Sequence, residues 1–202
     1  MTLVVGITGG IGAGKSTLSE YLKKKRFPVH ESDKIVSDMY NKPNKSFLNI
    51  VIKNGLKGAV KKRKIDKKFI TNVFFVNQKI KNILQKYIHK ELKASRERFI
   101  KKNINTKKKA IFLDIPLLLE NKLEKNFDYV VCVISTKKIR TIRVLKDKKF
   151  KKKILNKIFK SQTTNKERRS RSNIIINNNK TKKDFIFAAE QALMRIIKWE
   201  KL

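Results

Sequence analysis

Residues 4–17, VVGITGGIGAGKST, join an apolar run, a glycine-rich turn and a Lys-Ser-Thr sequence without interruption. Their spacing matches G-x-x-x-x-G-K-[ST], with Gly9, Gly14, Lys15 and Ser16 at the fixed positions. The apolar, largely β-branched run predicts a buried parallel strand. The glycines 9, 10, 12 and 14 are expected to adopt positive φ, so that backbone N–H groups can approach an anion. Because a helix that starts at residue 16 has unpaired N–H groups in its first turn, the stretch predicts a polyphosphate site.

Two other interpretations of this stretch are weaker. A glycine-rich turn can be only a turn, but the complete pattern arises by chance in about one per cent of chains of this length. A G-x-G-x-x-G dinucleotide loop would leave the Lys-Ser pair unexplained. In a phosphate loop, by contrast, Lys15 reaches the β and γ phosphates of the nucleotide and the Ser16 hydroxyl ligates Mg²⁺.

The composition predicts a soluble globular protein with one sizeable core. The 202 residues are 40% hydrophobic and include 12 Phe, and the single cysteine lies in the apolar run 129–134. No apolar run is long enough to span a bilayer and no signal peptide is evident, so a cytoplasmic location is expected. The formal charge of +36 is spread along the chain as Lys, among many Asn, Ile and Phe residues, which favours AT-rich coding and a solvated lysine surface over a nucleic-acid face.

Apolar runs alternate with helical patterns along most of the chain. Strands are predicted at the start and at 27–33, 110–115, 129–134 and 172–179, and helices at 15–25, 34–40 and 183–198. Residues 41–105 have helical periodicity and no clear strand. The order predicts an α/β fold of the P-loop NTPase type, a doubly wound five-stranded parallel sheet with a helical substrate-binding insertion and a helical lid. The expected division is a core of 1–40, 106–145 and 172–202, an insertion of 41–105 and a lid of 146–171.

Acidic residues follow two of the predicted strands. Asp33 ends the second and Asp114 the third, at the edge where ligands of open α/β sheets bind. From spacing alone, Asp33 is equally well interpreted as a catalytic acid or as the N-cap of the next helix. Asp114 suits a water-mediated hold on Mg²⁺ or a capping role. His89 lies off the apolar stripe of a helix, where a lone histidine is usually structural.

The segment 137–171 is helical and intensely basic. Its functional interpretation is a mobile flap that brings Arg and Lys to phosphates and excludes water. A solvated helical hairpin is the alternative, and most of its lysines fit that better.

With these pieces placed, the whole chain resembles the dephospho-CoA kinases. The matching stretches, in the family's order and spacing, are ITGGIGAGKST, VHESD with Asp33, the Ile88-His89 pair, LDIPLLLEN at 113–121, and a late series of Gln162, Arg168 and IIINNN. The chain departs from the family pattern in the triplet Glu31-Ser32-Asp33, whose first acid is longer, in Lys90 in place of a proline after the histidine, and in Lys67 or Lys68 in place of an arginine.

The resemblance implies transfer of a phosphoryl group from ATP to the ribose 3′-hydroxyl of dephospho-CoA, with Mg²⁺ as cofactor. Asp33 would be the general base, and Lys15, Arg168 and Arg143 would neutralise charge, with Arg140 and Lys146 competing for the lid's phosphate contacts. Asn178 would lie near the adenine, and the insertion would bind the CoA moiety. The residues implied for the nucleotide are Gly10, Ile11, Gly12, Ala13, Gly14, Lys15, Ser16, Thr17 and Asn178, and those for the acceptor are Thr8, Asp33, His89, Leu117 and Glu120, with Ser16 as the metal ligand.

Two other functions compete with this one. Another small-acceptor P-loop kinase, for a nucleoside or nucleoside monophosphate, would share the loop but would not require PLLLEN or the late Asn cluster. A basic nucleic-acid-binding protein with a vestigial nucleotide site is disfavoured because no aromatic-interleaved basic motif is present. The expected partners are therefore small molecules, with no membrane, no dedicated nucleic acid and a monomeric state.

Overall fold

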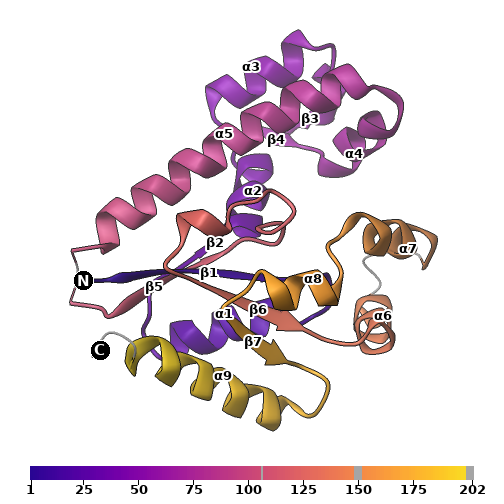
Figure 1. Ribbon diagram of the computed structural model, residues 1–202. Helices are drawn as coiled ribbons and strands as arrows, with labels where there is room; N and C mark the ends of the chain where they lie inside the picture. The colour runs from indigo at the N-terminus through magenta and orange to yellow at the C-terminus, as the bar shows by residue number, and fades with distance from the viewer. Residues whose placement is uncertain (106, 148–151, 199–202) are drawn as a thin grey trace. The chain divides into compact units, whose positions relative to one another are not determined.

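The computed structural model of the chain describes residues 1–105, 107–147 and 152–198 (Figure 1). Its strands are β1 (Leu3–Gly9), β2 (Val29–Glu31), β3 (Val60–Lys61), β4 (Lys64–Ile65), β5 (Ala110–Asp114), β6 (Tyr129–Ile134) and β7 (Ile174–Asn177). Its helices are α1 (Lys15–Lys24), α2 (Ser32–Asn41), α3 (Lys45–Lys53), α4 (Lys67–Val76), α5 (Gln78–Asn103), α6 (Lys137–Lys146), α7 (Lys152–Ser161), α8 (Asn165–Ser170) and α9 (Lys182–Lys198), with short 3-10 turns η1 (Lys57–Ala59) and η2 (Glu124–Asn126).

Five strands form one parallel sheet in the order β2-β5-β1-β6-β7. The predicted fold class is confirmed, and the fourth strand has the expected bounds. The register pairs Ile7 of β1 and Glu31 of β2 with Asp114 of β5, so all three strands end at the same edge. Because β1 runs directly into the glycine loop, that edge carries the phosphate loop.

Each face of the sheet packs an apolar cluster of its own. Alternate residues of the strands, such as Val5 and Ile7 of β1, pack with α1 and α9, which Figure 1 shows together on one side of the sheet. The strand residues in between, such as Ile111 and Leu113 of β5, face the other side of the sheet. They pack against Leu118 and its neighbours after β5 and against the end of α5. Burial on both faces explains why the strands are apolar without interruption.

The chain divides into two compact units, Met1–Glu31 with Phe99–Leu202, and Ser32–Arg98. The boundaries expected from the sequence, 40/41 and 105/106, differ from these because α2 packs with the second unit, whose cluster includes Tyr40 with Phe47, Leu84 and Ile88. The described helices of the expected lid, α7 and α8, belong to the first unit. Its residues 148–151, like 106 and 199–202, lie outside the described residues.

The expectation of no strand in 41–105 is wrong, because β3 and β4 form a two-residue antiparallel hairpin. Its turn residues Lys62 and Arg63 have φ of 47° and 60°. The second expected strand shortens to Val29–Glu31, and Asp33 becomes the second residue of α2 rather than its cap.

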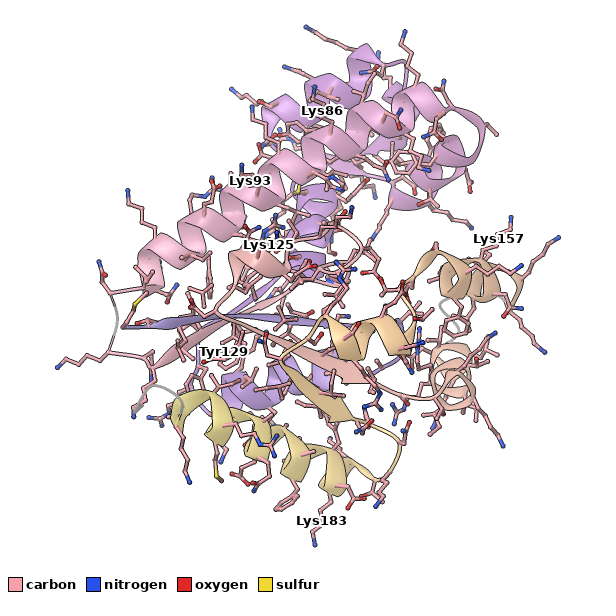
Figure 2. All side chains as sticks on the ribbon, in the orientation of Figure 1. Lys86, Lys93, Lys125, Tyr129, Lys157 and Lys183 are labelled. Atoms are coloured by element: carbon pink, nitrogen blue, oxygen red, sulfur yellow. The ribbon has the colours of Figure 1, made fainter. Side chains whose placement is uncertain are left out.

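Lysine side chains cover the surface of both units. Figure 2 labels Lys86, Lys93, Lys157 and Lys183, all exposed and pointing away from the ribbon. A solvated lysine surface is what the even spread of charge along the sequence predicts. Among the described residues, no helix has the length and apolar character needed to cross a bilayer.

Candidate active site: a phosphate loop held by distant side chains

Three glycines give the phosphate loop its shape. Gly9, Gly12 and Gly14 have φ of 151°, 72° and 111°, a region that residues other than glycine rarely adopt. The expectation that Gly10 also takes positive φ is wrong. Gly10 provides space instead, because a Cβ there would overlap the guanidinium of Arg140 and would displace that side chain.

Helix α1 begins directly behind the loop and directs its first N–H groups toward it. Gly14 is the N-cap and offers no side chain, and the first helical bond runs from the Leu18 N–H to the Gly14 carbonyl (3.2 Å). The N–H groups of residues 15–17 therefore have no acceptor within the helix and suit an anion. The side chain of Ser16 is exposed there, and those of Lys15 and Thr17 are half-buried.

A polar chain from α6 supports the loop at Ala13. Arg143 donates from Nη2 to Oδ1 of Asn178 (3.2 Å), and Asn178 donates from Nδ2 to the Ala13 carbonyl (2.8 Å). Within the described part of the chain, the buried Nη1 of Arg143 has no hydrogen-bond acceptor. A buried guanidinium nitrogen without an acceptor is costly, so this atom is suited to an oxygen of a bound ligand.

A second pair of side chains holds Ile11. Arg140 of α6 donates from Nε to the Ile11 carbonyl (2.8 Å), and the Ile11 N–H donates to Oε1 of Gln162 (3.1 Å). The sequence singled out Arg140 and Gln162 only as a lid candidate and as part of a resemblance. No local pattern signals their contact, since 129 and 151 residues separate them from Ile11.

Polar groups also gather where β1 and β5 end. The buried Thr8 donates to the carbonyl of Pro116 (3.3 Å), and Ser19 of α1 donates to Oδ2 of Asp114 (3.0 Å). Glu31, at the end of β2, forms an ion pair with Lys23. Asp33 follows two residues later in the chain, exposed in the first turn of α2.

Two residues expected at the site, Arg168 and Glu120, form a buried ion pair. The Arg168 side chain is 1% exposed, and its Nη2 donates to Oε1 of Glu120 (2.9 Å). The same Oε1 accepts from the backbone N–H of Thr163 (2.9 Å). The pair thus fixes the segment before α8 to the segment that follows β5, and contact of either residue with substrate stays a prediction.

The remaining expected acceptor residues lie at the surface. Leu117 is 44% exposed just after β5 in the first unit. His89 is exposed on α5 in the second unit. Their roles in binding the acceptor stay predictions.

Comparison with known proteins gives consistent matches over nearly the whole chain. The dephospho-CoA kinase family model matches residues 3–184. A dephospho-CoA kinase of Fusobacterium nucleatum subsp. nucleatum is 33% identical over 190 residues, covering 94% of this chain and 96% of that protein. One from Oceanobacillus iheyensis is 32% identical over 184 residues, covering 90% and 91%. Among solved structures, a dephospho-CoA kinase from Campylobacter jejuni has a TM-score of 0.76 at 25% identity, covering 99% of this chain and all of that one.

The fold extends beyond that family. The structure of a shikimate kinase from Acinetobacter baumannii superposes with a TM-score of 0.51 at 14% identity, covering 98% of this chain and 94% of that one. At that identity the likeness concerns the fold alone.

Proposed function

Since the chain belongs to the dephospho-CoA kinase family, whose members use ATP to phosphorylate dephospho-CoA to CoA, we propose that it transfers the γ-phosphoryl group of ATP to the ribose 3′-hydroxyl of dephospho-CoA. The observation that carries the proposal is the loop itself. Positive-φ glycines and the free N–H groups of α1 form a polyphosphate cradle at the edge where β2 leads into Asp33.

Asp33 is proposed as the general base. Its carboxylate is exposed, so the hydroxyl of an acceptor can reach it. The 3′-oxygen would attack the γ-phosphorus as its proton passes to the Asp33 carboxylate, while the bond from that phosphorus to the bridging oxygen breaks and ADP leaves. Alignment and neutralisation of charge dominate the rate of such transfers.

Neutralisation of the negative charge on the ATP phosphates is assigned to residues of the first unit. Lys15 would contact the β and γ phosphates, and the unpaired Nη1 of Arg143 offers a donor from α6. Thr8, Leu117, His89 and Glu120 stay proposed acceptor contacts, Arg168 a proposed charge stabiliser, and Asn178 a proposed neighbour of the adenine.

The donor set fits Mg²⁺ held largely by phosphates. The described residues contain no cluster of three or more His, Cys, Asp or Glu side chains that could bind a metal. Mg²⁺ keeps several waters and needs one or two protein oxygens beside phosphates, which the exposed Ser16 hydroxyl and, through water, Asp114 can supply. When bound, the ion would neutralise charge that develops on the phosphates.

The test is a coupled assay for ADP release. Purified protein is given ATP and Mg²⁺ with dephospho-CoA, or with a panel of nucleosides and nucleoside monophosphates, and turnover is expected with dephospho-CoA alone. Lys15→Met should abolish it, while Lys24→Met, at an exposed position on the same helix, should not. Phosphorylation of a nucleoside or its monophosphate, with dephospho-CoA ignored, would show that the acceptor is wrong. We further propose a monomer acting in the cytoplasm.

A further inference from the structure

The loop residue Ile11 has both of its backbone polar groups held by side chains, one on α6 and one just after α7. Arg140 of α6 binds its carbonyl (2.8 Å), and Gln162, just after α7, accepts its N–H (3.1 Å). Arg140 also donates from Nη2 to the same Oε1 of Gln162 (3.1 Å). Three hydrogen bonds therefore close a ring that holds the two peptide groups on either side of the Ile11 Cα.

The guanidinium in this ring is closely packed. Arg140 is buried, and its Cζ lies 4.7 Å from the centre of the Phe159 ring of α7, in cation–π contact. Gly10 leaves space for the guanidinium, and a Cβ at Gly12 would lie 2.9 Å from the Arg140 carbonyl. The loop and α6 are therefore complementary in shape as well as hydrogen-bonded.

Arg140 makes no ion pair with a carboxylate in the described ranges of the chain. Burial, and then the nearby charge of Arg168, lower the pKa of Arg140 to about 10. A buried cation without a carboxylate is costly, so packing alone is a poor reason for an arginine here. Its hydrogen bonds to the loop are the specific gain.

We propose that Arg140 and Gln162 are positioning residues for ATP: they fix the backbone of Ile11, so the shape of the phosphate loop depends on α6 and on the segment that follows α7. The inference rests on the proposed binding of ATP by the loop. Two of the three guanidinium nitrogens of Arg140, Nε and Nη2, bond to the loop and to Gln162, and the proposal assigns this role to the side chain. This assigns Arg140 a different role from that of Arg143, which keeps an unpaired Nη1.

Lysine and methionine at position 140 separate positioning from charge. Lysine keeps the charge but cannot bind Ile11 and Gln162 together, because it lacks the guanidinium fork. We expect Arg140→Lys and Arg140→Met to weaken ATP binding alike, by about tenfold, the value of one to two hydrogen bonds. Calorimetry with ATP alone gives the affinity, and steady-state assays should show a raised KM for ATP with kcat changed less than about threefold.

Gln162→Met tests the same ring without touching a charge. It should weaken ATP binding to a similar extent, and Arg140→Met with Gln162→Met should cost no more than either alone, because each opens one ring. Arg169→Met is the matched control: Arg169 is exposed on α8, donates to Asn177 (3.1 Å), and should bind ATP as the parent does.

Three outcomes would overturn the proposal. Normal affinity in Arg140→Lys with loss in Arg140→Met would mean that charge acts directly. Costs that multiply in the double variant would mean that the two residues act separately. A lowered unfolding midpoint with unchanged ATP affinity of the folded protein would mean a merely structural role, and Gln162→Met supplies this measurement if the Arg140 variants fail to fold. Because ATP is the only ligand, a wrong acceptor would leave these results untouched.

Discussion

The phosphate loop and the unit Ser32–Arg98 are held in opposite ways. The polar bonds of the loop come from side chains 129 to 165 residues away, namely Arg140, Gln162 and Asn178. In the second unit most of the side-chain hydrogen bonds reach five residues or fewer, among them the helix caps from Asn44, Asp66 and Asn77.

This difference separates a site from a scaffold. A loop fixed by distant partners keeps one conformation only while the whole first unit is folded. Its geometry therefore depends on α6 and on the residues that follow α7 and β7. A unit with local caps and an apolar cluster around Phe47 and Leu84 specifies its own helices. Changes to the distant side chains that hold the loop should therefore alter ATP binding, and changes in the second unit should leave it intact.

The largest effect is expected at Asp33, the residue of the second unit that is proposed as the general base. Asp33→Asn removes the proton acceptor and keeps the shape, so kcat should fall by about 10²- to 10⁴-fold with ATP affinity unchanged. Steady-state kinetics with dephospho-CoA and calorimetry with ATP measure the two quantities. Asp38→Asn, exposed further along α2, is the control and should retain full turnover. Turnover near normal in Asp33→Asn would remove the base from the mechanism.

The next effect compares an ion pair from each unit. Glu120→Ala leaves the buried Arg168 guanidinium without its carboxylate and should lower the free energy of unfolding by about 3 kcal/mol. Glu97→Ala removes an exposed partner of Lys93 (3.9 Å) and should have no measurable effect. Urea unfolding of both variants gives the difference. Equal stability of the two would mean that the Glu120–Arg168 pair is solvated.

Two glycines at positive φ allow a matched test of backbone strain. Gly12 (φ 72°) and Gly55 (φ 78°) would each cost about 1–2 kcal/mol on change to alanine. A Cβ at Gly12 would also lie 2.8 Å from Val144 Cγ2, whereas that at Gly55 meets nothing within 4 Å. Gly12→Ala should therefore lose stability further and bind ATP more weakly, while Gly55→Ala should bind ATP normally. Weakened ATP binding in Gly55→Ala would contradict the separation of the units.

The sequence predicted the parts of the fold that carry local signals. Unbroken apolar runs predicted the sheet, and the fixed spacing around Lys15 predicted the loop. The β3–β4 hairpin was missed because two-residue strands have no periodicity, and its turn uses Lys62 and Arg63 where a positive φ favours glycine or asparagine. The ring of Arg140, Gln162 and Ile11 could not be predicted, because no sequence pattern near residue 140 or 162 indicates that these side chains contact Ile11. For Gly10 the sequence predicted a positive φ, whereas the glycine provides space for Arg140. That contact could not be predicted because Arg140 lies on α6, far away in the sequence.

The smallest effect uses pH to compare the two units. Cys132 lies fully buried in β6, and burial raises the pKa of its thiol from 9.0 to about 11. Between these values the unfolded chain loses the proton and the folded one keeps it, so the contribution of Cys132 to stability falls as pH rises above about 9. Tyr40, in the second unit, has its phenol pKa raised by burial from 10.0 to about 12, so its contribution should fall only above pH 10.

Difference measurements isolate these two groups from the many lysines. The free energy of unfolding of the parent minus that of Cys132→Ala should fall by about 1 kcal/mol between pH 8 and pH 10. The parent minus Tyr40→Phe should change much less over that range, since neither state of the tyrosine has lost most of its protons by pH 10. A difference for Cys132→Ala that stays flat across this range would mean that the thiol is hydrated in the folded sheet. Water would then reach the core of the first unit at β6, and the phosphate loop could not depend on a dry sheet behind it.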